Sequence, residues 1–179
     1  MKKLRGRVDR KEWFMYPQTV NASFSPNLND IVFLAAILQP PFFSLDADDA
    51  VNYGTIGAVI GHEITHGFDE EGSKFDAKGN LKSWWTSADR KRFEKRAEVL
   101  RKQFDRYEVA DGVKVNGKLT LGENIADLGG AAIALDAYRL RAARNAPPAI
   151  DGFSPIQRFF LGFAVFECEN TRPEFEKTQ

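Results

Sequence analysis

Thr55-Ile56-Gly57-Ala58-Val59-Ile60-Gly61-His62-Glu63-Ile64-Thr65-His66 joins an apolar, uncharged run to two histidines and a glutamate. On an α-helix, residues four apart share a face, so His62 and His66 can reach the same metal ion. Glu63 lies beside that face and can contact a water on the metal without being a ligand. The alternative is a structural histidine pair on a solvated helix, but the apolar run favours a buried helix, which rarely carries unpartnered polar groups. The segment therefore predicts a zinc site.

The composition is that of one ordinary globular domain of 179 residues, with 43% hydrophobic and 28% charged residues. Lys+Arg and Asp+Glu are equal at 25 each, which disfavours nucleic-acid partners. No apolar run approaches the roughly 20 residues of a membrane span. The basic start of the chain is not followed by an apolar stretch, so no signal peptide is predicted. Cys168 is the single cysteine, which excludes an internal disulfide.

The pattern of residues predicts an α+β fold that is mainly helical, with a small sheet beside the helix of His62 and His66. Residues 19–24 and 31–38 flank a turn and are predicted to pair as a hairpin. Helices are expected at about 50–68, 87–107 and 122–144. A last helix is expected to begin with Ser154 as N-cap and Pro155 as its first residue, and to end before Arg172-Pro173. Residues 111–117 are expected to form a turn and a short strand.

A catalytic zinc ion usually takes three protein ligands and a water. The chain has no third histidine, so the third ligand must be a carboxylate, and Glu123 is the best candidate because glycines flank it at the start of an apolar helix. Asp127 lies one turn further on the same face. Asp127 and Asp69 could each accept a hydrogen bond from the second ring nitrogen of a histidine. The alternative for Glu123 and Asp127 is a pair of acids that compensate the helix dipole.

The segments 62–69 and 122–127 together resemble the neprilysin and endothelin-converting-enzyme family of zinc endopeptidases. Further segments resemble that family in the same order: Asn21-Ala22, 37–43, Asn116-Gly117 and 171–175. The resemblance implies a gluzincin-type catalytic domain that binds one Zn²⁺ per chain. By this resemblance the metal ligands are His62, His66 and Glu123, and the catalytic base is Glu63. Asp127 is a further catalytic residue, and Asp127 and Asp69 are acids that hold the ligand histidines without touching the metal. Asn21 and Ala22 are substrate-binding residues.

Members of that family are several times longer, with a helical portion before this region and a further His and Arg after the Arg-Pro-Glu segment. Residues 1–179 are therefore expected to be a partial metallopeptidase catalytic domain that lacks both ends of the family domain. The expected activity is zinc-dependent hydrolysis of peptide bonds, with peptides as partners. The alternatives are a catalytically impaired zinc-binding fragment, or an interaction module without a metal. The compartment is not readable from the residues; the resemblance suggests an extracytoplasmic or membrane-associated protein.

Overall fold

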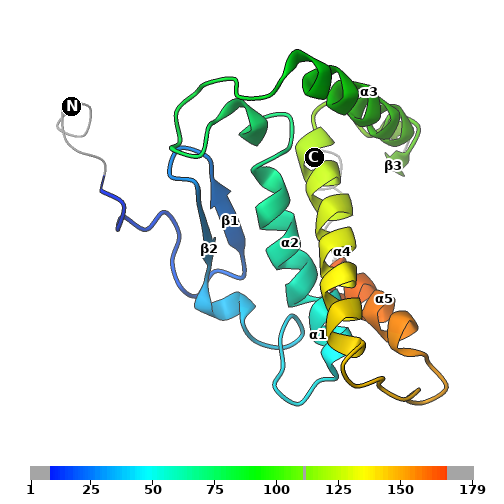
Figure 1. Cartoon of the computed structure of the whole chain (residues 1–179). Helices are drawn as coiled ribbons and strands as arrows, with labels where there is room; N and C mark the ends of the chain where they lie inside the picture. Colours follow the sequence, from blue (N-terminus) through cyan, green and yellow to red (C-terminus); the bar gives the residue numbers. More distant parts are fainter. Residues whose placement is uncertain (1–8, 111, 169–179) are drawn as a thin grey trace.

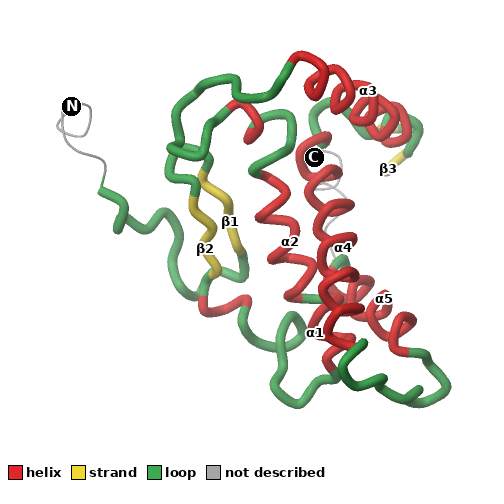
Figure 2. The backbone as a smooth tube through the Cα atoms, in the orientation of Figure 1, coloured by secondary structure: helices red, strands yellow, loops and turns green. Residues whose placement is uncertain are grey.

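The computed structural model describes residues 9–110 and 112–168, and its fold is mainly helical with two small sheets (Figure 1, Figure 2). The predicted α+β fold with a sheet beside the histidine helix is confirmed. In chain order the elements are β1 (Ala22–Ser25), β2 (Asp30–Phe33), a 3₁₀ turn (Ala35–Ile37), α1 (Asp49–Gly54), α2 (Ile56–His66), a 3₁₀ turn (Gly72–Lys74), α3 (Ser87–Phe104), β3 (Glu108–Ala110), β4 (Val113–Lys114), α4 (Leu121–Ala142) and α5 (Pro155–Phe166).

Helices α2 and α4 run side by side through the middle of the molecule, and their contact is the most extensive between any two of its elements (Figure 1). They meet backbone to backbone at Gly61 and Gly130. A Cβ atom built on Gly61 would lie 2.7 Å from the Gly130 carbonyl oxygen, and one built on Gly130 would lie 2.6 Å from the Ala58 carbonyl oxygen. Both distances are shorter than real Cβ contacts, so the two helices can approach this closely only because both residues are glycine.

The β1–β2 hairpin lies on the side of α2 opposite α4 (Figure 1). Its strands are antiparallel, with Ala22 opposite Phe33 and Ser25 opposite Asp30, so the predicted hairpin is confirmed. The predicted second strand is too long, because β2 ends at Phe33 and the chain then forms a 3₁₀ turn. That turn buries Leu34 and Ile37, which are three residues apart. An extended strand would have pointed these two side chains to opposite faces.

The predicted helix 50–68 is wrong in one respect, because it is broken at Thr55 into α1 and α2. Thr55 has φ −94° and ψ −95°, outside the helical region. The amide of Ile56 donates to the carbonyl of Phe42, at 3.1 Å, instead of continuing the α1 hydrogen-bond ladder. Gly54, just before the break, lies so close to α5 that a Cβ there would be 2.0 Å from the Phe159 carbonyl oxygen. The break thus allows α1 and α2 to follow different packing partners.

The largest buried cluster joins α1, α2, α4 and α5 at the end of the α2–α4 pair. Tyr138 and Phe159 are fully buried there, and their rings stack with centroids 6.2 Å apart. Helix α5 begins as predicted: Pro155 is its first residue, and the Ser154 hydroxyl accepts from the Gln157 amide in a capping box. Helix α5 ends at Phe166, and the segment 171–175 lies outside the described residues.

The helix expected at 87–107 is α3, which packs against α4, ends at Phe104 and has Ala97 buried. Strands β3 and β4 pair antiparallel as a short ribbon. The short strand expected within 111–117 is β4, whereas β3 lies before that range. Within the described part of the chain, no helix combines the length and the apolar character that crossing a membrane requires.

Candidate metal centre

Three candidate ligand atoms converge on one point between α2 and α4. The Nε2 atoms of His62 and His66 are 2.9 Å apart, and the Oε2 atom of Glu123 lies 3.3 Å from the first and 3.5 Å from the second. Ligand atoms around a tetrahedral zinc ion are about 3.3–3.6 Å apart, given zinc–ligand bonds of about 2.0–2.2 Å. Two of the three distances match this spacing, and a small opening of the imidazoles brings the third to it. The donor set therefore fits zinc.

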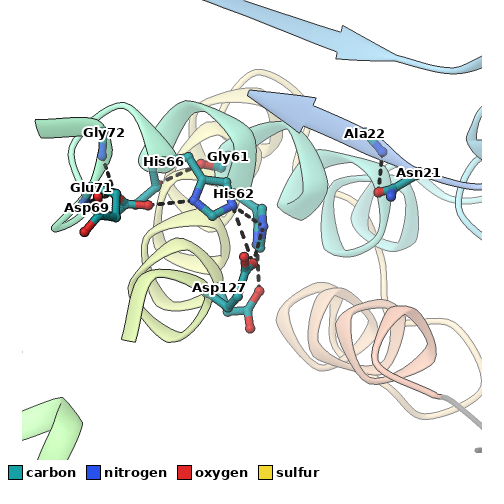
Figure 3. A network of polar contacts seen from close by, with 11 residues as sticks. Asn21, Ala22, Gly61, His62, His66, Asp69, Glu71, Gly72 and Asp127 are labelled. Atoms are coloured by element: carbon teal, nitrogen blue, oxygen red, sulfur yellow. Dashed lines mark hydrogen bonds and ion pairs between the residues drawn. The ribbon is translucent and has the colours of Figure 1, made fainter. Parts of the chain in front are cut away.

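Each histidine is oriented by a carboxylate on its other ring nitrogen (Figure 3). His62 Nδ1 lies 2.7 Å from Asp127 Oδ1, and His66 Nδ1 lies 2.7 Å from Asp69 Oδ2. Such a contact fixes the tautomer that leaves Nε2 free for a metal. Asp69 is itself held in place, because its Oδ1 accepts from the amides of Glu71 and Gly72. The structure thus brings together all five predicted metal-centre side chains.

Carboxylates dominate the electrostatics of the metal-free cluster. Burial lowers the pKa of His62, but hydrogen bonds to Asp127 and Glu123 outweigh it and raise the pKa to about 9. In the same way, burial is outweighed at His66 by Asp69 and Glu123, and the pKa rises to about 10. Hydrogen bonds from both histidines hold the pKa of Glu123 far below its ordinary value. The carboxylates around the two histidines therefore favour positive charge at this point.

Glu63 lies between α2 and the β1 strand and is only 5% exposed. Burial raises the pKa of its carboxyl group, while the nearby histidines and the backbone amide of Phe24 lower it. A carboxylate with a raised pKa is a better proton acceptor near neutral pH. Phe24 was not among the predicted site residues, because its contribution comes from the backbone, which no side-chain pattern reveals.

A cleft of about 610 Å³ runs from these histidines to the hairpin. Its lining includes Asn21, Ala22, Ser23 and Phe24 from the start of β1, as well as Glu70, Glu71, Leu119 and Gly122. Among the described residues β1 pairs with β2 alone, so its other edge has no strand partner, and Ala22, Ser23 and Phe24 of this strand line the cleft. Figure 3 shows Asn21 and Ala22 apart from the histidine cluster, with the Asn21 side-chain oxygen 2.8 Å from the Ala22 amide. The structure brings these two residues to the cleft and not to the metal centre.

The arrangement has the parts of a hydrolytic zinc site: three converging ligand atoms, a buried carboxylate beside them and an open strand edge. The sequence model of peptidase family M13 matches residues 21–179. The chain belongs to peptidase family M13. The resemblance to the neprilysin and endothelin-converting-enzyme family is thereby confirmed, since both names occur among the relatives of this chain.

Two M13 relatives and one solved structure show the extent of the similarity. Membrane metallo-endopeptidase-like 1 of Mus musculus is 46% identical over 180 residues, which cover 98% of this chain and 24% of the relative. Endothelin-converting enzyme 1 of Rattus norvegicus is 44% identical over 174 residues, which cover 96% of this chain and 23% of the relative. The zinc metalloprotease ZMP1 of Mycobacterium tuberculosis, solved with an inhibitor, has 54% identity and a TM-score of 0.88, covering 92% of this chain and 26% of that one. The chain spans about a quarter of the length of these M13 proteins.

Proposed function

We propose that this chain is the zinc-binding part of a metalloendopeptidase. His62, His66 and Glu123 would hold one Zn²⁺, and the observation that carries the proposal is the convergence of their three ligand atoms. A bound zinc ion supplies Lewis acidity and lowers the pKa of a water beside it. The membership of family M13 and the similarity to a zinc metalloprotease support the same metal.

In this proposal, Glu63 is the general base. It takes a proton from the attacking water and passes it to the amine that leaves when the peptide bond breaks. Its burial supports the role, because a desolvated carboxylate accepts a proton more readily than an exposed one. Asp127 and Asp69 hold the imidazole rings so that both Nε2 atoms face the same point. Asp127 thus assists the chemistry through His62.

The proposed substrates are peptides bound in extended form along β1. Among the described residues one edge of this strand has no strand partner, and the strand lines the cleft, so a peptide can add to that edge by backbone hydrogen bonds. Asn21 and Ala22 lie where this peptide would pass. The Asn21 side-chain oxygen accepts a hydrogen bond from the Ala22 amide. The Ala22 amide could bind a peptide only if this hydrogen bond broke; otherwise the Asn21 side chain would bind the peptide. One relative is membrane metallo-endopeptidase-like 1, and this similarity supports an extracytoplasmic or membrane-associated setting for the longer protein.

The test is zinc content together with peptide hydrolysis. We expect about one zinc per chain in the wild type, and loss of zinc in His62→Ala, His66→Ala and Glu123→Ala. Glu63→Gln should keep the metal, because Glu63 is not a ligand, but should lower turnover of a peptide with hydrophobic side chains by about 10²-fold or more. Glu71→Gln is the matched control, because this exposed glutamate lines the same cleft.

The outcomes separate the proposal from its alternatives. Zinc bound by wild type together with turnover that Glu63→Gln abolishes supports the peptidase. Zinc bound without any turnover that depends on Glu63 decides for a catalytically impaired zinc-binding fragment. Unchanged zinc content in Glu123→Ala would refute the third ligand. If the chain takes up no zinc at all, the remaining alternative is an interaction module without a metal.

A further inference from the structure

Glu70 connects the loop that follows α2 to the first turn of α4. A Cβ atom built on Gly122 would lie 3.2 Å from Oε1 and 3.6 Å from Oε2 of Glu70, so this carboxylate rests against the backbone of the turn. Burial raises the pKa of Glu70, and the backbone amides of Glu70 itself and of Gly122 act in the opposite direction. The Gly122 amide therefore faces the carboxylate.

The position of Glu70 has a cost. Its Oε2 atom is buried and has no hydrogen-bond partner among the described residues, and its neighbours Asp69 and Glu71 add like charge. An unsatisfied buried acceptor destabilises the fold. Another glutamate one residue away, Glu71, avoids this cost because it is exposed and pairs with Lys74 at 2.5 Å. Glu70 thus keeps a carboxylate oxygen buried, whereas the neighbouring Glu71 side chain is exposed.

The Glu70 carboxylate stabilises the first turn of α4. The amides at the start of a helix lack partners within the helix, and the helix dipole favours negative charge there. Thr120, at the N-cap, does not serve these amides: its hydroxyl donates to the Asn116 carbonyl and accepts from the Asn124 side chain. The turn carries one acid of its own, Glu123, and Asp69 Oδ2 would lie 3.4 Å from a Cβ atom on Gly122. Glu70 adds a further carboxylate to this turn from a segment distant in sequence.

This contact closes a chain of interactions around the candidate metal centre. His66 is oriented by Asp69, Glu70 is the next residue, Glu70 rests on Gly122, and Glu123 follows Gly122. We propose that Glu70 is a positioning residue: it fixes the first turn of α4 against the loop of Asp69, and so holds Glu123 opposite the two histidines. The role rests on the proposed zinc site and does not require Glu70 to touch the metal.

Chelator competition measures this role directly. Glu70→Ala should weaken zinc affinity about tenfold, which is the lower end of the effect of losing a residue that orients a metal ligand. Glu70→Gln removes the charge and replaces one carboxylate oxygen by an NH2 group, but it keeps one acceptor oxygen. It should therefore recover most of the affinity and remain about threefold weaker than wild type. Glu71→Ala is the matched control. It removes the same charge from the neighbouring residue, and we expect its affinity to stay within about twofold of wild type.

A second readout excludes a merely structural effect. In the metal-free chain, Glu70→Ala should speed hydrogen exchange at the amides of Gly122 and Glu123, while amides near the middle of α4, such as Ala134, keep their wild-type rates. Uniformly faster exchange along α4 would instead indicate general destabilisation and overturn the positioning role. If Glu70→Ala does not fold, Glu70→Gln decides, and a zinc affinity equal to wild type in that variant overturns the role.

The two proposals fail in different ways. If the wild-type chain binds zinc and Glu70→Ala binds it equally well, the positioning role is wrong and the zinc site stands. If the wild-type chain itself binds no zinc in the same titration, the zinc site is wrong, and the role of Glu70 falls with it.

Discussion

Asp127 and Asp69 do the same work for the two histidines but reach them by different routes. Asp69 lies three residues after His66, in the loop at the end of the same helix, so its contact is nearly local. Asp127 comes from α4 and reaches His62 only because α2 and α4 pack together. Its side chain is also more exposed, 38% against 6% for Asp69.

Asp127→Ala should weaken zinc affinity by about 10–100-fold, because the His62 ring loses the acceptor that orients it. A chelator competition titration measures the change. Asp136→Ala is a matched control, since this exposed aspartate lies on the same helix and pairs only with Arg139 among the interactions of the described residues. If Asp127→Ala binds zinc as tightly as wild type, Asp127 does not orient His62, and compensation of the helix dipole remains as its role.

The residues that sequence could predict are those whose geometry is local. The spacing of His62, Glu63 and His66 defines one helical face, and Asp69 follows within one turn. Glu123 is different, because spacing alone left it open between metal ligand and helix-dipole acid, and the family resemblance was needed to choose. Glu70 was missed altogether. The three consecutive acids at 69–71 were a signal, but only the contact with Gly122 distinguishes Glu70 from its exposed neighbour Glu71.

At the scale of elements, the glycine contact between α2 and α4 sets the distance across which the histidines and Glu123 meet. Gly130→Ala would place a Cβ atom 2.6 Å from the Ala58 carbonyl oxygen and 2.7 Å from the His62 amide nitrogen. Because these neighbours are backbone atoms, the helices must separate. We expect about 1–3 kcal/mol of destabilisation from overpacking, together with weaker zinc binding, as measured by denaturant unfolding and zinc titration.

Gly57→Ala is the control for that variant. Gly57 is also in α2, but a Cβ there would meet its nearest neighbours at 3.5–3.7 Å, an ordinary contact. The same chemical change should therefore leave stability unchanged or slightly improved, since alanine favours a helix more than glycine does. Equal losses in both variants would mean that the close approach at Gly130 has no special effect.

The helices and the hairpin were predictable from patterns of apolar residues, whereas their ends depended on tertiary contacts. The break at Thr55 follows from the bond between the Ile56 amide and the Phe42 carbonyl, and from the close packing of Gly54 on α5. Neither contact leaves a trace in local sequence, which reads as one continuous helix. In the same way, β2 ends early because Leu34 and Ile37 are both buried, which an extended strand could not achieve.

At the scale of the whole molecule, the raised histidine pKa values link folding to pH. In the metal-free folded chain they are about 9 for His62 and about 10 for His66, above the ordinary value of 6.5. The folded state therefore holds these protons more tightly than the unfolded state. The resulting stabilisation is fully present below pH 6.5 and is lost as pH rises through 9 and 10.

With chelator present, the melting temperature should therefore fall between pH 7 and pH 10. With zinc present the trend should reverse over the lower part of this range, because Nε2 must lose its proton before it can bind the metal. Thermal melts with and without zinc measure both trends. A His62→Gln/His66→Gln variant supplies the background from other titrating groups, and a slope equal to that background in the metal-free wild type would refute the linkage.

The pairing of α2 with α4 brings together parts of the chain that are far apart in sequence, with all of α3 and the β3–β4 ribbon between them. A metal bound by both His66 and Glu123 would act as a reversible cross-link that closes the intervening segment into a loop. Ordering such a loop costs chain entropy, which grows only slowly with its length. The segment between the two helices could therefore lengthen or shorten at little cost in free energy, provided that its two ends still return to the same pair of helices.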